Sequence, residues 1–151
     1  MTPATLAAPL AQRYADSPAA VPTAAELTAL RQWIREQWAN IPATVRFTPA
    51  GLSLADAKRR YIHTGDLLIS TAHNNHPYLT WMENAMFRAV HDWQHIISGA
   101  DDTLLGEIAT YYVAKSTAPQ SIWWMLCSEI VLQAAACIYF GEFQFQKLVK
   151  F

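Results

Sequence analysis

Two histidines and a carboxylate form the part of this sequence best suited to chemistry. His91 and His95 are four residues apart in the stretch HDWQH, and Glu107 follows after eleven intervening residues. On an α-helix, residues i and i+4 project from one face, so both imidazoles can reach the same point. Imidazole nitrogens and carboxylate oxygens are common ligands of divalent metal ions. The pattern indicates a candidate metal site, with the alternative that the two histidines are unrelated core or surface residues.

Two further carboxylates, Asp92 and Glu129, are candidate catalytic residues. Asp92 follows the first histidine, where it could be a fourth ligand, an orienter of a histidine or a solvated side chain. H-D-x-x-H is also a variant of the H-E-x-x-H metalloprotease motif, but Asp is shorter than the Glu base by one methylene. Glu129 lies in the apolar run WWMLCSEIVLQAAACIYF, where a buried carboxylate needs a cation or hydrogen-bond donors. It could be a ligand or an acid/base group, or it could pair with Arg88 or lie at an exposed helix edge.

A helical hairpin is needed to bring these side chains together. Apolar residues at helical intervals predict a helix that begins near Pro77 and carries both histidines. Ser98-Gly99-Ala100 is expected to end this helix, and an aspartate at 101 or 102 to cap the next one, which ends at Thr117-Ala118-Pro119. Because antiparallel helices run back past each other, Glu107 is expected to return to the level of the histidines.

The remaining pattern predicts a mainly α-helical, single-domain bundle. Thr23 and Glu26 have the spacing of a capping box, and they open a predicted helix over residues 24–39. Residues 44–70 favour a small β-hairpin together with a short helix opened by Ser53.

The two ends of the chain differ in composition. Residues 1–22 are rich in Ala and Pro and are expected to form a flexible N-terminal arm, with residues 23–151 as the helical metal-binding domain. A last helix is expected from about residue 120 into the C-terminal QFQKLVKF. Its residues 122–140 are nearly all apolar, but Glu129 and Gln133 lie in the middle. These two polar side chains favour a buried central helix over a membrane span.

Composition and charge limit the classes of partner. The 151 residues are 52% hydrophobic and 15% charged with a net charge of -1, which is typical of a folded globular protein. Basic residues are scattered apart from Lys58-Arg59-Arg60, so we expect no nucleic-acid partner. Cys127 and Cys137 would lie about 15 Å apart along one helix and could not form a disulfide, which favours a reducing, cytoplasmic location. Self-association into a homo-oligomer is the prior expectation for such a domain.

The stretch HDWQH with its later Gly-Glu pair resembles the zinc-binding signature of the coenzyme Q (ubiquinone) biosynthesis family, H-D-x-x-H followed by Glu at this distance. The likeness covers about residues 88–119 and includes Gly99 and the Ala118-Pro119 pair. By this resemblance the metal ligands would be His91, Asp92, His95 and Glu107. The resemblance also implies a helical protein at the membrane periphery that acts on polyprenylated aromatic precursors, with oxidative decarboxylation as its chemistry.

The sequence departs from that family beyond the metal-binding pattern. The chain is shorter, and after Gly106 it reads EIATYYVAKS in place of a Lys-Trp-Phe-Glu-like continuation. A looser similarity links it to uncharacterised phage-encoded proteins in which a similar series is followed by Glu-x-x-x-Gln, matched here by Glu129 and Gln133. The departures concern the substrate more than the metal.

The sequence therefore predicts a divalent-metal site, with zinc as the first choice and Fe(II) as the alternative. The most concrete function is a metalloenzyme that acts on an apolar aromatic or prenyl-lipid substrate, with peripheral membrane contact. Two other functions stay open, a metal-dependent hydrolase and a non-catalytic lipid-binding or scaffold module with a structural metal. Ester or peptide turnover that disappears in Asp92→Asn would identify the hydrolase, and saturated coordination would identify the structural role.

Overall fold

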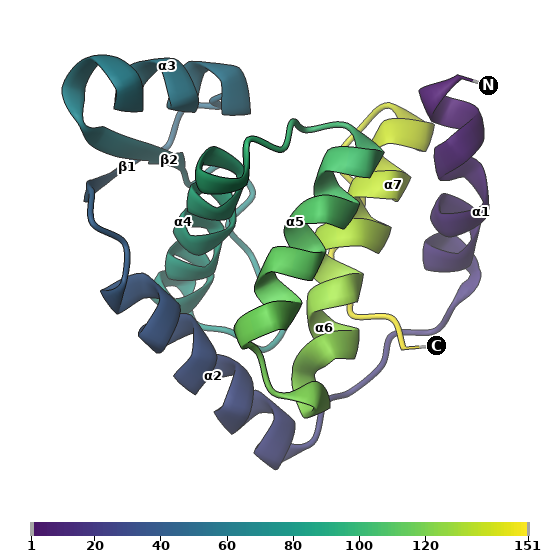
Figure 1. Cartoon of the computed structure of the whole chain (residues 1–151). Coiled ribbons are helices and arrows are strands. Elements are labelled where there is room, and N and C mark those ends of the chain that lie inside the picture. Colours follow the sequence, from purple (N-terminus) through teal and green to yellow (C-terminus); the bar gives the residue numbers. More distant parts are fainter. Residues whose placement is uncertain (1, 151) are drawn as a thin grey trace. The chain divides into compact units, whose positions relative to one another are not determined.

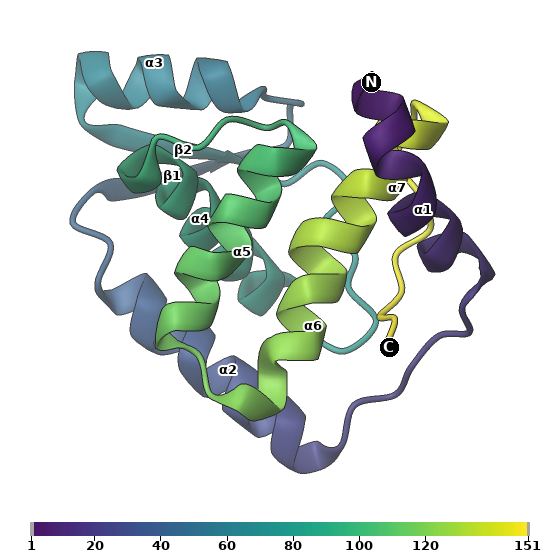
Figure 2. The same ribbon diagram turned by 45° about the vertical axis from the view of Figure 1, so that its right-hand side comes forward.

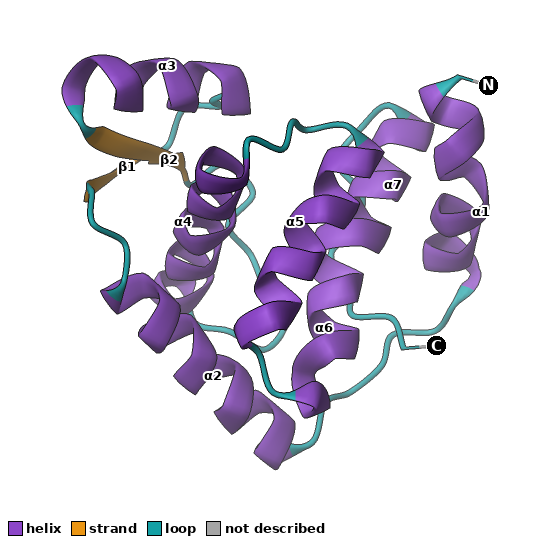
Figure 3. Cartoon of the chain, in the orientation of Figure 1, coloured by secondary structure: helices purple, strands orange, loops and turns teal. Residues whose placement is uncertain are grey.

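The computed structural model describes residues 2–150, and they form two compact units. One unit contains the residues up to Ala29 and those from Ala100 onward, and the other contains residues 30–99. Helices dominate both units, and the small sheet belongs to residues 30–99 (Figure 3). The predicted mainly α-helical fold with a small β element near residues 44–70 is confirmed.

The β element is a parallel pair of strands. Strands β1 (Thr44–Thr48) and β2 (Asp66–Ser70) pair in parallel with Thr44 opposite Asp66, and helix α3 (Leu54–Thr64) connects them (Figure 1). The expected hairpin is thus a β-α-β unit, because a chain that returns through a helix enters the second strand in its original direction.

Two residues at the ends of α3 make this crossover. The Ser53 hydroxyl accepts a hydrogen bond from the Asp56 N–H, as expected for the residue that opens the helix. Gly65 ends the helix with φ at 74°, a left-handed conformation that favours glycine. The chain therefore reverses immediately before β2.

The sheet packs against helix α4 (Trp81–Ser98), which carries both histidines. Leu67, Ile69 and Ala89 form the buried centre of this core. Partly buried hydrophobic side chains surround them: Trp38, Ile41, Ala43, Val45, Phe47, Trp93 and Ile96. Apolar packing on one side of α4 thus fixes the helix that positions the candidate site.

Helix α4 begins four residues later than predicted. Thr80 is its N-cap, and a capping box joins Thr80 to Glu83 through hydrogen bonds of 2.9 and 3.1 Å. The backbone N–H groups of Tyr78 and Leu79 instead donate to Nδ1 of His76, each at 3.0 Å. The prediction from Pro77 was wrong because a Thr-x-x-Glu cap satisfies more backbone donors than a proline start.

Helix α2 (Ala24–Ala39) has the predicted bounds, opened by Thr23 and Glu26 as a capping box. Helix α1 (Pro3–Asp16) lies beside helix α7 (Gln133–Phe140), as Figures 1 and 2 both show. The structure therefore differs from the expected flexible arm. The reason is an apolar face at helical spacing on α1, which includes Ala11 and Tyr14.

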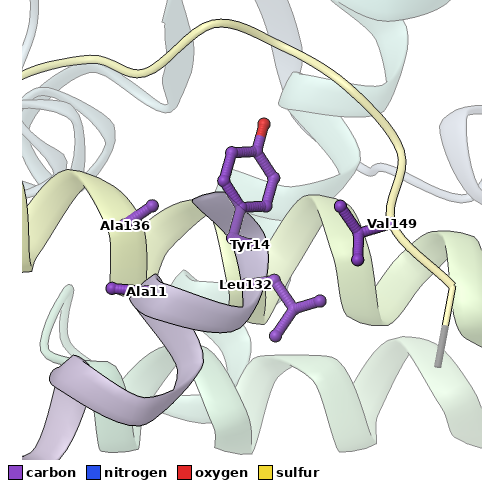
Figure 4. Packing of buried hydrophobic residues seen from close by; sticks show 5 residues of the cluster. All are labelled: Ala11, Tyr14, Leu132, Ala136 and Val149. Atoms are coloured by element: carbon purple, nitrogen blue, oxygen red, sulfur yellow. The ribbon is translucent and has the colours of Figure 1, made fainter. Parts of the chain in front are cut away.

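Figure 4 shows the core that holds α1 in place. Its buried members are Ala11, Tyr14, Leu132, Ala136 and Val149. They come from α1, from the apolar helical run after residue 120 and from the C-terminal segment, so distant parts of the sequence share one cluster.

The apolar run contains four consecutive pieces of helix. They are a 3-10 turn (Gln120–Ile122), α6 (Trp123–Cys127), a π-helical turn (Ser128–Leu132) and α7. The run ends at Gly141, with φ at 77°, so the predicted continuation into QFQKLVKF was wrong. By length and composition Gln120–Phe140 could cross a membrane, but 56% of an apolar 18-residue stretch within it is buried inside the protein.

Candidate metal site

His91 and His95 lie on consecutive turns of α4 and point the same ring nitrogen at each other. Their Nε2 atoms are 3.2 Å apart, and the ring planes are inclined at 74°. His95 is buried, with 1% of its surface exposed, and His91 is half-buried. In a tetrahedral zinc site with Zn–N bonds of about 2.0–2.1 Å, two ligand nitrogens lie about 3.3 Å apart. The spacing of the pair fits one metal ion bound by both Nε2 atoms.

Glu107 lies in the first turn of helix α5 (Leu104–Thr117). Thr103 is the N-cap of this helix, and its hydroxyl accepts a hydrogen bond from the Gly106 N–H at 3.2 Å. Asp101, one of the two expected caps, instead accepts hydrogen bonds from the N–H and hydroxyl of Thr103, at 3.2 and 2.5 Å. The Thr103 cap fixes the residue at which α5 begins, and it thereby fixes the position of Glu107 in the first turn. The helix ends at Thr117, as predicted.

Two glycines shape the turn between α4 and α5. Gly99 ends α4 with φ at 71°, as predicted from its left-handed tolerance. Gly106 is required for a steric reason, because a Cβ atom there would collide with the backbone oxygen of Asp101. The residue before Glu107 therefore has to be small.

The candidate ligand group consists of His91, His95 and Glu107. One ligand atom of each can be chosen so that all three atoms lie within 4.8 Å of one another. Two imidazoles and a carboxylate are a donor set suited to zinc and also to Fe(II). This group could hold a metal ion, and its chemistry does not name which one.

Asp92 is outside this group. It lies one helical turn after Arg88, whose guanidinium donates a 2.6 Å hydrogen bond to the backbone oxygen of Ala72. Burial lowers the pKa of Arg88, and the negative charge of Asp92 opposes that shift. The carboxylate of Asp92 therefore favours the charged form of Arg88, a half-buried side chain on the same helix.

Glu129 is also outside the group and lies in the π-helical turn. Its Oε2 accepts a hydrogen bond from the side-chain amide of Gln146 at 3.1 Å. This amide is one of the donors that a carboxylate in an apolar run requires, and no local pattern in the sequence indicates Gln146 as the donor. π-helical turns are frequent at functional sites, which keeps Glu129 a candidate acid/base group.

Gln94, the polar residue inside HDWQH, was not among the residues predicted from the sequence. Gln94 is 4% exposed, and its Oε1 has no hydrogen-bond partner among residues 2–150. Its burial could have been predicted, because Val90, one helical turn earlier, belongs to the apolar stripe and is buried too.

Comparisons with protein-family models, with curated proteins and with solved structures give no match for this chain. The function is therefore inferred from the geometry and chemistry of the site.

Proposed function

We propose that His91, His95 and Glu107 bind one divalent metal ion, and that the protein is a metalloenzyme acting on an apolar aromatic or prenyl-lipid substrate. Zinc is the first choice and Fe(II) the alternative. The main support for a metal site is the 3.2 Å separation of the two histidine Nε2 atoms. Two neutral imidazoles at this distance repel each other through their lone pairs unless a proton or a metal ion lies between them. A metal ion uses both lone pairs at once.

The number of ligands favours catalysis over a structural role. Structural zinc sites have four protein ligands, whereas catalytic sites have three and keep one position open. The group here has three members. When bound in such a site, a divalent ion acts as a Lewis acid toward an oxygen-bearing ligand. A three-ligand group therefore supports an enzyme.

The surrounding residues would position and protonate the substrate. Burial holds the ring of His95 in one orientation, and the cap on α5 fixes the start of the helix that carries Glu107. Asp92, next to a ligand, and Glu129, in the π-helical turn, are the candidates to hold or move a proton.

The substrate class rests on the resemblance to the coenzyme Q biosynthesis family and on apolar side chains near the site in sequence. Leu105 and Tyr112 on α5 are 67% and 60% exposed, although both are large and apolar. Exposed side chains of this kind can contact a prenyl chain or a membrane surface. A cytoplasmic location with peripheral membrane contact, and a homo-oligomeric state, complete the proposal.

The test is the metal content of the protein, purified without a metal-binding affinity tag and measured by plasma mass spectrometry. We expect near-stoichiometric metal in the wild type and its loss in the double variant His91→Ala, His95→Ala. The matched control is the double variant His63→Ala, His73→Ala, because both of these histidines are exposed. Absence of metal from the wild type after reconstitution with zinc and with anaerobic Fe(II) would overturn the proposal.

A further inference from the structure

Gln94 has an unexplained acceptor in the interior of the protein. Its side chain is 4% exposed, and its Oε1 has no hydrogen-bond partner among the described residues. Buried polar atoms are almost always hydrogen-bonded, so this exception requires an explanation. By contrast, Asn84 on the same helix is 3% exposed and donates a 2.8 Å hydrogen bond to the side-chain oxygen of Asn74.

The position of Gln94 on α4 places it beside His91. The two residues are three apart, and side chains at i and i+3 are neighbours on a helix surface. Helical side chains lean toward the N-terminus, so Gln94 extends back over the turn that contains His91. The Nδ1 atom of His91 is itself buried, on the ring edge opposite the Nε2 that faces His95.

Metal binding would create the donor that Gln94 lacks. A neutral imidazole that binds a metal through Nε2 carries its proton on Nδ1, and that N–H is almost always donated to an oxygen acceptor. We propose that Gln94 is the positioning residue of His91, with its Oε1 accepting the His91 Nδ1–H in the metal-bound protein. This inference rests on the proposed function, because the Nδ1–H tautomer of His91 is the form that a metal on Nε2 requires.

Zinc affinity, measured by competition with a coloured chelator, gives the first test. We expect Gln94→Leu to weaken zinc binding about 10- to 100-fold, because outer partners of metal-bound histidines contribute that much to affinity. Gln94→Glu keeps an oxygen acceptor and is expected to retain wild-type affinity or exceed it. Asn84→Leu is the matched control, since it removes an equally buried amide from α4, and we expect its zinc affinity to stay close to that of the wild type.

A spectrum of the imidazole groups gives the second test and separates positioning from general loosening of the fold. In zinc-bound protein labelled with ¹⁵N at histidine, the His91 Nδ1–H should give a signal protected from exchange with water. We expect Gln94→Leu to lose this protection while the signals of His95 remain, and Gln94→Glu to shift the His91 proton further downfield. The Glu variant keeps the test decisive if the Leu variant does not fold.

The outcomes distinguish this inference from the function on which it rests. If the wild type binds neither zinc nor Fe(II), the proposed function fails and the role of Gln94 fails with it. The role of Gln94 alone is overturned by either of two results in a wild type that binds zinc. In the first, Gln94→Leu has the same zinc affinity and the same His91 Nδ1–H signal as the wild type. In the second, the His91 Nδ1–H signal of Gln94→Glu is not shifted.

Discussion

His91 and His95 turn their Nε2 atoms toward each other at 3.2 Å across one turn of α4. Both residues belong to one regular helix, so no loop has to close to form this half of the site. The third member, Glu107, depends on where the next helix starts, and that start is fixed by Thr103. The site thus combines a rigid histidine pair with a carboxylate whose position depends on a turn.

Metal binding should stabilise the fold. Zinc at about 100 times its dissociation constant is expected to add about 2.7 kcal/mol to the free energy of unfolding, because the folded state alone brings the ligands together. For a chain of this size that corresponds to a rise of the melting temperature by about 5–10 °C. Thermal unfolding with zinc and with a chelator measures the effect. His95→Ala should show no rise, whereas His63→Ala should behave as the wild type. An equal rise in both variants would place zinc elsewhere on the chain.

The charge of Glu107 should matter more than its size. We expect Glu107→Gln to weaken zinc binding by more than about tenfold, because loss of even an outer partner of a metal ligand costs about 10–100-fold. Asp102→Asn is the control, since it removes an exposed carboxylate from the connection between α4 and α5. Isothermal titration of both variants with zinc measures the difference. Equal losses in the two variants would mean that Glu107 acts only through the general field of negative charge.

Most of the helices could be predicted from the sequence because their end signals are local. The Thr23 and Glu26 pair opens α2 at the predicted residue, and Gly99 ends α4 as expected. The start of α4 was misplaced because Pro77 and Thr80 are both suitable openers, and only the hydrogen bonds show that Thr80 is used. The packing of α1 on α7 depends on contacts between residues far apart in sequence, which local patterns do not encode.

The site was predictable to the extent that it is periodic. The i and i+4 spacing placed His91 and His95 on one face, and the turn allowed Glu107 to join them. The partners of the other polar groups were not predictable. Gln146 reaches Glu129 from a segment expected to be helical, and only the structure shows that the buried Oε1 of Gln94 has no hydrogen-bond partner among the described residues.

Gly106 should be sensitive to a single added methyl group. A Cβ atom there would meet the backbone oxygen, the side-chain oxygen and the carbonyl carbon of Asp101, so Gly106→Ala forces the turn before α5 to shift. We expect a loss of about 1–3 kcal/mol in the free energy of unfolding, together with weaker zinc binding through Glu107. Urea unfolding and zinc titration measure the two effects. Gly51→Ala is the control, because a Cβ atom there meets nothing within 4 Å. Equal stability of the two variants would show that the turn relaxes freely.

Tyr14 should make the stability of the protein fall at alkaline pH. Burial raises the pKa of Tyr14 from 10.0 to about 12, and its hydroxyl donates to the Phe145 backbone oxygen at 2.8 Å and accepts from the Lys147 N–H at 3.1 Å. The unfolded chain releases this proton near pH 10 and the folded protein near pH 12, so the folded state holds more protons between those values. The contribution of the Tyr14 hydroxyl to stability is therefore fully present below about pH 10. The free energy of unfolding then decreases by about 2–3 kcal/mol as the pH approaches 12.

The variant Tyr14→Phe separates this effect from the titration of other groups. We expect it to be less stable than the wild type by about 1 kcal/mol at pH 8, because its hydrogen bonds are lost, but to lose less stability between pH 10 and 12. Urea unfolding at a series of pH values gives the difference between the two curves, from which the other titrating groups cancel. Tyr112→Phe, at a position that is 60% exposed, is expected to run parallel to the wild type. If Tyr14→Phe also runs parallel, the Tyr14 hydroxyl reaches solvent before the fold opens, and its burial does not control the alkaline transition.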